Sequence, residues 1–149
     1  MATRQKTDDY LLHQLHRANQ KANGYFSAAT SKLSITPRQL IILQLIDDLD
    51  RPSQTVVTEA SGIDRSTLAE VVARLARLGL IRRVKSEKDS RAYVLSLTAE
   101  GRQKLAAGKR LALAVEERIQ EELGDQLAAQ LRSVLLAFLP PASVPDGEE

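Results

Sequence analysis

The sequence predicts a mainly α-helical fold with one small β-hairpin, and three observations support this prediction. Apolar residues recur at spacings of three and four along most of the 149-residue chain, which is typical of amphipathic helices. The spacing changes to two over residues 80–85 and 92–97, which predicts two short strands. Helix-capping residues stand in front of several of the apolar patterns. We therefore expect helices on both sides of a single hairpin.

The first two helices are predicted over residues 10–30 and from Pro37 onward. Apolar side chains recur through residues 10–30 at the spacing of one helix face. The second helix begins with a capping box, in which Thr36 is the N-cap and Gln39 is the third helical residue. Pro37 takes the first helical position, where its missing N–H needs no partner. The polar residues 47–52 end this helix.

A helix–turn–helix pattern follows. Residues 53–60 form a short helix candidate, Gly62 falls in the turn, and Asp64 caps a second helix over residues 65–78, which Gly79 closes. The apolar stripe of this second helix consists of Leu68, Val71, Val72, Leu75 and Leu78. Its other side carries short polar and long basic side chains, so we expect that side to face away from the core.

After the hairpin the sequence predicts two further helices. Thr98 caps the first, which runs to about residue 123. Gly124 interrupts the pattern, and the second helix ends near residue 139. The aliphatic stripes of both helices are too long for so small a chain to cover, so a two-fold partner that supplies the same helices would bury them. A helical hairpin folded against its own chain is the alternative.

The charges of the chain are unevenly distributed. The net charge of +2 comes from 21 basic and 19 acidic residues, yet residues 65–91 hold eight basic side chains against three acidic ones, and residues 99–149 hold six against nine. The basic stretch covers the second helix of the helix–turn–helix and the hairpin. We therefore expect this part of the chain to face a polyanion, with a scatter of solvated surface charges as the alternative.

The sequence contains no motif of a catalytic or cofactor site. It has no cysteine, which excludes disulfides, zinc–thiolate sites and iron–sulfur clusters. No nucleophile elbow, zinc-protease helix or dinucleotide fingerprint is present. His13 and His16 lie one helical turn apart, but two histidines without a third ligand make a weak metal site. We expect neither an enzyme nor a cofactor nor a bound metal.

The chain also carries no signal that would direct it to a membrane. Its N-terminus lacks the apolar run of a secretory signal, and no stretch approaches 18 uninterrupted apolar residues. We therefore expect a cytoplasmic protein without a membrane partner.

A helix–turn–helix followed by a two-stranded hairpin forms a winged helix–turn–helix. Its second helix, with arginine and polar side chains on the outer face, fits the major groove of DNA, and the hairpin tip can reach the adjacent minor groove. We expect DNA contacts from Arg65, Ser66, Thr67, Glu70, Arg74 and Arg77 on the helix, and from Lys88 and Arg91 at the tip. The alternative function is a winged helix that docks a protein instead of DNA.

Five short motifs follow one another between residues 36 and 101. They are Thr36-Pro37-x-Gln39, Gly62-Ile63-Asp64-Arg65-Ser66-Thr67, Leu75-x-x-x-Gly79-Leu80-Ile81-x-Arg83, Asp89-x-Arg91 and Leu97-Thr98-x-x-Gly101. Together they resemble the multiple-antibiotic-resistance regulator (MarR) family of bacterial transcription factors. The resemblance implies a homodimer on a pseudo-palindromic operator, and it implies that Asp89 holds Arg91 for the minor groove. Glu70 departs from the family pattern, where a basic or neutral base-contacting residue is common.

The resemblance also implies how the chain is divided. We expect an N-terminal dimerisation helix within residues 1–35, the DNA-binding domain within 36–98 and C-terminal dimerisation helices within 99–139. The two prolines and the acidic composition of residues 140–149 separately predict a disordered tail. The expected dimer-interface residues are Leu11, Leu15, Leu111, Val115, Ile119, Leu127, Leu131 and Leu135.

Many members of the family lose their affinity for DNA when a small anionic or aromatic ligand enters a cavity beside the first helix. The residues of this chain that we expect at such a cavity are His13, His16, Arg17 and Tyr25, with packing in the dimer interface as their alternative role. The resemblance thus implies a repressor that is released from its operator by an effector such as an aromatic acid or its coenzyme A thioester.

Overall fold

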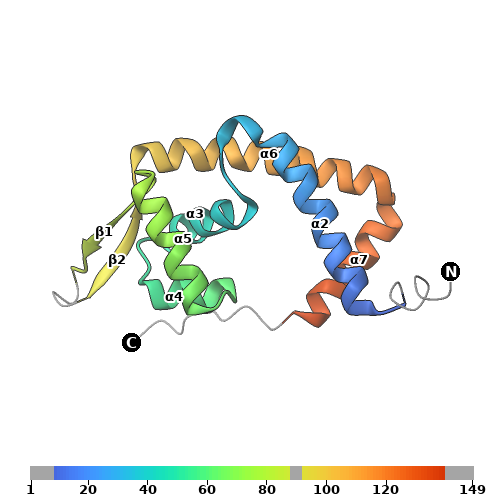
Figure 1. Cartoon of the computed structure of the whole chain (residues 1–149), viewed down its shortest axis with the longest axis horizontal. Coiled ribbons are helices and arrows are strands. Elements are labelled where there is room, and N and C mark those ends of the chain that lie inside the picture. The colour runs from blue at the N-terminus through green and yellow to red at the C-terminus, as the bar shows by residue number, and fades with distance from the viewer. Residues whose placement is uncertain (1–8, 88–91, 140–149) are drawn as a thin grey trace.

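The fold is mainly helical with one two-stranded hairpin, as predicted (Figure 1). The computed structural model describes residues 9–87 and 92–139. In chain order the elements are α2 (Leu11–Ala29), the short 3₁₀ helix η1 (Ser31–Leu33), α3 (Pro37–Asp48), α4 (Gln54–Ser61), α5 (Arg65–Arg77), β1 (Ile81–Lys85), β2 (Tyr93–Leu97), α6 (Ala99–Leu123) and α7 (Asp125–Phe138). The wing-tip candidates Lys88, Asp89 and Arg91 and the tail 140–149 lie outside the described residues.

The long helix α6 connects the two ends of the molecule (Figure 1). It begins directly after β2, at the end where α3, α4, α5 and the hairpin gather, and it packs against both α3 and α2. At the other end Gly124, with a φ of 75°, turns the chain into α7. The hairpin and α5 therefore lie at one end of α6, and α7 lies at the other.

Side-chain caps fix where four of the helices begin. The backbone N–H of Gln39 donates to Thr36 Oγ1 at 3.2 Å, and the backbone N–H of Thr36 donates to Gln39 Oε1 at 3.0 Å, which completes the predicted capping box of α3. Ser53, Asp64 and Thr98 cap α4, α5 and α6 through their side-chain oxygens. The predicted starts of these helices are confirmed to within one residue.

The hairpin is anchored in the core by one of its faces. The two strands pair antiparallel, with Ile81 opposite Leu97 and Lys85 opposite Tyr93. Ile81, Leu95 and Leu97 are buried, whereas Lys85 and Tyr93 at the far end of the ladder are exposed. The base of the wing therefore belongs to the core, and its distal end projects beyond it.

One hydrophobic core holds the helix–turn–helix, the hairpin and the start of α6 together. Its fully buried members include Ile42, Leu43, Val57, Leu68, Val72 and Leu75. The prediction that Leu78 continues the apolar stripe of α5 is wrong, since its side chain is 47% exposed. The reason is that α5 ends at Arg77 and Leu78 is its C-cap, where the chain leaves the helix toward Gly79.

The residues expected at a dimer interface fall into two groups. Val115 is buried and Ile119 is half-buried against the core of their own chain, so both contribute to packing within one subunit. The others are exposed or half-buried: Leu11, Leu15, Leu111, Leu127, Leu131 and Leu135. No residue of α7 is buried.

Candidate nucleic-acid interface

The start of α5 is held by Asp64. Its carboxylate oxygen Oδ1 accepts hydrogen bonds from Ser66 Oγ at 2.6 Å and from the backbone N–H of Thr67 at 2.9 Å. These bonds, that from Ser66 first, hold the pKa of the Asp64 carboxyl well below its usual range. The cap thus fixes the Ser66 hydroxyl and leaves the remaining backbone N–H groups of the first turn available to a phosphate.

Replacing Asp64 with alanine is expected to lower the melting temperature at neutral pH by about 3 °C, as typical for the loss of an N-cap. The folded-state pKa lies below the unfolded-state value of about 3.9, so the ionised cap stabilises the fold above that value. This contribution is lost as the pH falls toward the folded-state pKa.

Calorimetry of the wild type and Asp64→Ala from neutral pH down to about pH 2 checks this expectation. The difference in melting temperature between the two proteins should become smaller as the pH falls. Asp64→Asn is the control, because it keeps an acceptor oxygen without a charge. A difference that stays constant over the whole range would contradict the assignment.

The outer face of α5 carries the side chains that the sequence predicts for DNA contact. Arg65, Ser66, Glu70, Arg74 and Arg77 are exposed, and Thr67 is half-buried. In the part of the chain that the structure describes, the side chains of Arg65, Glu70, Arg74 and Arg77 take part in no hydrogen bond or ion pair. Their charges are therefore free to meet a partner, and Glu70 does not neutralise a neighbouring arginine.

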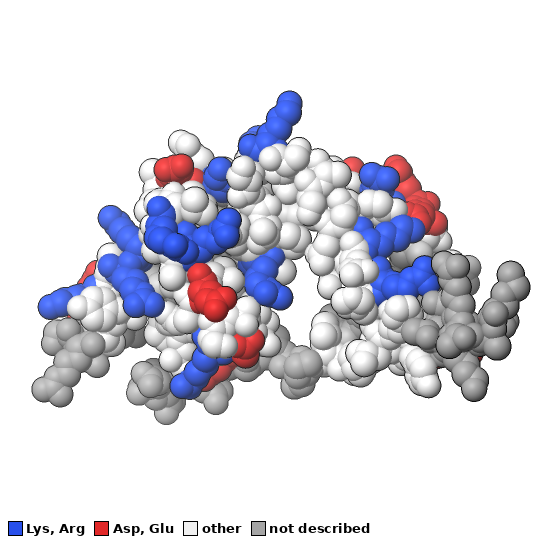
Figure 2. Space-filling view, in the orientation of Figure 1, with Lys and Arg blue, Asp and Glu red and all other residues white. Residues whose placement is uncertain are grey.

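Strand β1 carries exposed basic side chains that were not predicted from the sequence as DNA contacts. The side chains of Arg82 and Lys85 are exposed and have no hydrogen-bond or ion-pair partner within the described ranges. The Arg83 side chain donates to Gln54 Oε1 at 2.6 Å and so ties β1 to α4. The signal for them was the basic balance of residues 65–91, which includes all three. Figure 2 shows Lys and Arg side chains gathered over the end of the molecule that holds α5 and the hairpin.

The four residues expected at an effector cavity do not come together. His13 and His16 line an open pocket of about 520 Å³ with Tyr10 and Leu12, near the start of α2. Tyr25 lies nine residues further along the helix, about 13 Å away at 1.5 Å per residue. Arg17 is exposed and is not among the residues that line this pocket.

Tyr25 takes part in a polar cluster between α2 and α6. Its hydroxyl donates to Glu122 Oε2 at 2.5 Å, and the guanidinium of Arg118 lies 4.0 Å from the centre of its ring. Lys21 forms an ion pair with the same glutamate, and the bonds from Lys21 and Tyr25 lower the pKa of Glu122. Tyr25 therefore helps to join α2 to α6 in this structure.

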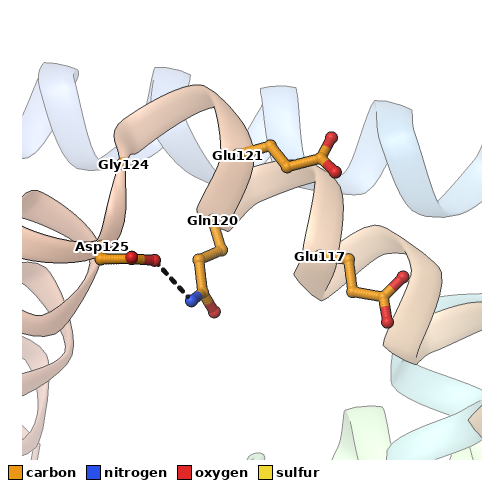
Figure 3. Close-up of a pocket in the computed structure, with 5 residues that line it drawn as sticks. All are labelled: Glu117, Gln120, Glu121, Gly124 and Asp125. Atoms are coloured by element: carbon orange, nitrogen blue, oxygen red, sulfur yellow. Dashed lines mark hydrogen bonds between the residues drawn. The ribbon is translucent and has the colours of Figure 1, made fainter.

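A second open pocket, of about 350 Å³, lies where α6 meets α7 (Figure 3). Its lining residues are Glu117, Gln120, Glu121, Gly124 and Asp125, and Gln120 Nε2 donates to Asp125 Oδ1 at 3.0 Å. Its three carboxylates make this surface unfavourable for a nucleic acid. Among the described residues there is no group of three or more His, Cys, Asp or Glu side chains placed to hold a metal ion.

No helix in the described ranges is both long enough and apolar enough to span a membrane.

Comparisons with known proteins agree with this geometry. Residues 33–92 match the MarR family model. The transcriptional regulator HosA of Escherichia coli O127:H6 (strain E2348/69 / EPEC) is 30% identical over 105 residues, which cover 70% of this chain and 75% of HosA.

Solved structures are similar over most of the chain. The transcriptional repressor CouR bound to a 23-mer DNA duplex is 30% identical, with a TM-score of 0.81 over 88% of this chain and 93% of CouR. CouR bound to p-coumaroyl-CoA gives 29% identity and a TM-score of 0.83 over 89% and 94% of the two chains. The chain therefore belongs to the MarR family of transcriptional regulators.

Proposed function

We propose that the protein is a homodimeric, DNA-binding repressor that releases its operator when a small anionic or aromatic ligand binds. The observation that carries the DNA-binding part is the outer face of α5, where Arg65, Arg74 and Arg77 are exposed without partners among the described residues. The similar protein CouR is a repressor known in a complex with a DNA duplex, which supports the same role here. Such a regulator acts in the cytoplasm, where the bacterial chromosome lies.

Within this proposal, residues 36–98 form the DNA-binding domain. Helix α5 enters the major groove with Arg65, Ser66, Thr67, Glu70, Arg74 and Arg77, and the wing adds Lys88, Asp89 and Arg91 at its tip. Arg82 and Lys85 of β1 are placed to contact phosphates beside the groove. Phosphate contacts from so many cations make the affinity fall steeply as the salt concentration rises.

Residues 1–35 and 99–139 provide the dimer contacts in this proposal. Large apolar side chains are exposed at the start of α2 and along α7, and a water-soluble monomer rarely leaves so many uncovered. A second copy would bury them in a two-fold interface and place two α5 helices about one DNA turn apart, roughly 34–36 Å, on a pseudo-palindromic operator.

The ligand class rests on CouR and on the shape of the molecule. CouR binds p-coumaroyl-CoA, an aromatic acid thioester, and we propose a ligand of that class, either an aromatic acid or its coenzyme A thioester. The space-filling view is hollowed between the DNA-binding end and the end that holds α2 and α7 (Figure 2). His13, His16, Arg17 and Tyr25 remain candidates for ligand contact from α2.

Replacing Arg74 with alanine is expected to weaken operator binding by at least about fivefold, because a good bidentate contact to a base contributes about 1–3 kcal/mol. The measurement is a fluorescence-anisotropy titration with a duplex of about 30 base pairs that the wild type selects from a random-sequence library, a length that holds two half-sites one turn apart. The melting temperature should stay unchanged, since the Arg74 side chain is exposed and makes no hydrogen bond or ion pair within the described chain.

Arg110→Ala is the matched control, because it removes the same charge from an exposed position of α6 outside the proposed DNA-binding surface. If Arg74→Ala binds the selected duplex as tightly as Arg110→Ala, the assignment of α5 is wrong. If the wild type selects no duplex, a protein-docking role takes its place.

A further inference from the structure

The connection between α3 and α4 pairs with the wing through an isolated β-bridge. The backbone N–H of Leu95 in β2 donates to the carbonyl oxygen of Pro52 at 2.8 Å, and an antiparallel β-bridge pairs Ser53 with Val94. These contacts attach the middle of β2 to the segment that leads into α4. The direction of the wing is therefore set partly by the chain in front of the helix–turn–helix.

A second contact also holds the wing, and it lies closer to the tip of the wing than the first. Arg51 Nη1 donates to Glu87 Oε1 at 2.7 Å, and this bond lowers the pKa of Glu87. Glu87 is the last described residue before the wing tip and lies six residues beyond Ile81 at the base of β1. At about 3.3 Å per residue this is a lever of about 20 Å, so a tilt of about 10° at the base would move Glu87 by about 3 Å.

The backbone between α3 and α4 adopts an unusual conformation that allows this contact. Asp50 and Arg51 have φ values of 45° and 66°, a left-handed conformation that is unfavourable for residues other than glycine. Such a conformation persists where the surrounding contacts fix it. Here it turns the chain after α3 so that both the Arg51 side chain and the Pro52 carbonyl reach the hairpin.

We propose that Arg51 and Glu87 are a positioning pair that holds the wing at the angle at which the hairpin and α5 engage one DNA duplex together. This inference rests on the proposed DNA-binding function. Both side chains are exposed, so the pair contributes little to the stability of the fold. Its effect is on the position of the hairpin at Glu87, since a displacement of about 3 Å there exceeds what a hydrogen bond to DNA tolerates.

The replacement Glu87→Gln separates this role from simple electrostatics. Removing a negative charge beside a DNA-binding surface would by itself strengthen DNA binding. A positioning role has the opposite sign: losing the ion pair frees the distal wing, and we expect binding of the selected duplex to weaken by about two- to fivefold. Glu100→Gln is the matched control, because the side chain of Glu100 is exposed and makes no hydrogen bond or ion pair among the described residues.

A double-mutant cycle and one measurement without DNA complete the test. Arg51→Gln combined with Glu87→Gln should bind no more weakly than the weaker of the two single variants, because both remove the same pair. The charge swap of Arg51→Glu with Glu87→Arg should restore most of the affinity. In the free protein, hydrogen exchange of the Leu95 amide should become faster in Glu87→Gln, since the bond from Leu95 to Pro52 lies under the same wing.

Each outcome decides between the two roles. If Glu87→Gln binds the duplex as tightly as Glu100→Gln, or if the two single effects simply add, the positioning role is overturned while the proposed function stands. If the wild type selects no duplex at all, the proposed function fails and the DNA role of the pair fails with it. Faster exchange of the Leu95 amide in that case would still show that Glu87 holds the wing.

Discussion

Replacing Gly101 with alanine is expected to destabilise the protein by about 3 kcal/mol, at the upper end of the range for overpacking. Gly101 lies in the first turn of α6, and a Cβ atom there would stand 1.9 Å from the carbonyl oxygen of Leu80 and 2.9 Å from its carbonyl carbon. The obstacle is backbone, which cannot rotate away as a side chain can. The melting temperature should fall by about 6–12 °C, measured by thermal unfolding.

The same carbonyl group joins α6 to the wing, which makes the expected effect large. Leu80 O accepts hydrogen bonds from the backbone N–H of Thr98 at 3.0 Å and from Thr98 Oγ1 at 3.2 Å. A Cβ on Gly101 therefore has to push α6 away from the base of the hairpin and break this joint.

Gly24 offers a matched control within α2. A Cβ atom added there meets nothing within 4 Å, so Gly24→Ala should stabilise the protein by about 0.5–1 kcal/mol through the higher helix propensity of alanine. If Gly101→Ala lowers the stability and Gly24→Ala raises it, the loss of stability at Gly101 comes from its close approach to the backbone of Leu80. A Gly101→Ala variant as stable as Gly24→Ala would show that α6 can shift at no cost.

Features that depend on neighbouring residues in the sequence could be predicted, because their chemistry is local. The caps at Thr36, Asp64 and Thr98 are hydrogen bonds over three residues, and the structure contains all of them. The polar face of α5 follows from the helical period, and Arg74 is exposed on it as expected. Leu78 was misplaced because a period alone does not show where a helix stops.

Contacts between distant segments could not be predicted in the same way. Arg51 and Glu87 are 36 residues apart, and Tyr25 meets Glu122 across 97 residues. Such pairs depend on the angle at which two elements cross, and neither spacing nor composition determines that angle. For the same reason the contacts of Tyr25 with Glu122 and Arg118 of α6 could not be derived from the spacing of residues along α2.

We expect substitutions in the exposed apolar stripe of α7 to have the largest effect on formation of the dimer. Spaced at three and four residues, Leu127, Leu131, Val134, Leu135 and Phe138 occupy one side of the helix and are 57%, 44%, 63%, 37% and 72% exposed. In the proposed two-fold dimer the interface buries two copies of each of these side chains, one from each subunit. A charge placed in the stripe therefore enters the interface twice.

Replacing Leu131 with glutamate is expected to raise the dimer dissociation constant by about 100-fold or more. Each Leu131 side chain is 44% exposed in one subunit, so burying two of them contributes about 1.3–2.6 kcal/mol. Leaving two glutamate carboxylates unpaired in the interface costs several kcal/mol more, and every 1.4 kcal/mol is a factor of ten. Light scattering over a dilution series should show dimers for the wild type and monomers for the variant at the same concentration. Binding of the selected duplex should weaken as well, because a monomer presents only one α5 helix to the operator.

Ser133→Glu is the control for this change, since Ser133 lies on the opposite side of the same exposed helix and should leave the dimer intact. Circular dichroism should show the same helix content in all three proteins, because Leu131 is already 44% exposed in one subunit. A Leu131→Glu variant that keeps this helix content and remains dimeric on dilution would refute the α7 interface. The dimer contacts would then have to come from α2 and α6, where Leu11, Leu12 and Leu113 are 66%, 80% and 64% exposed.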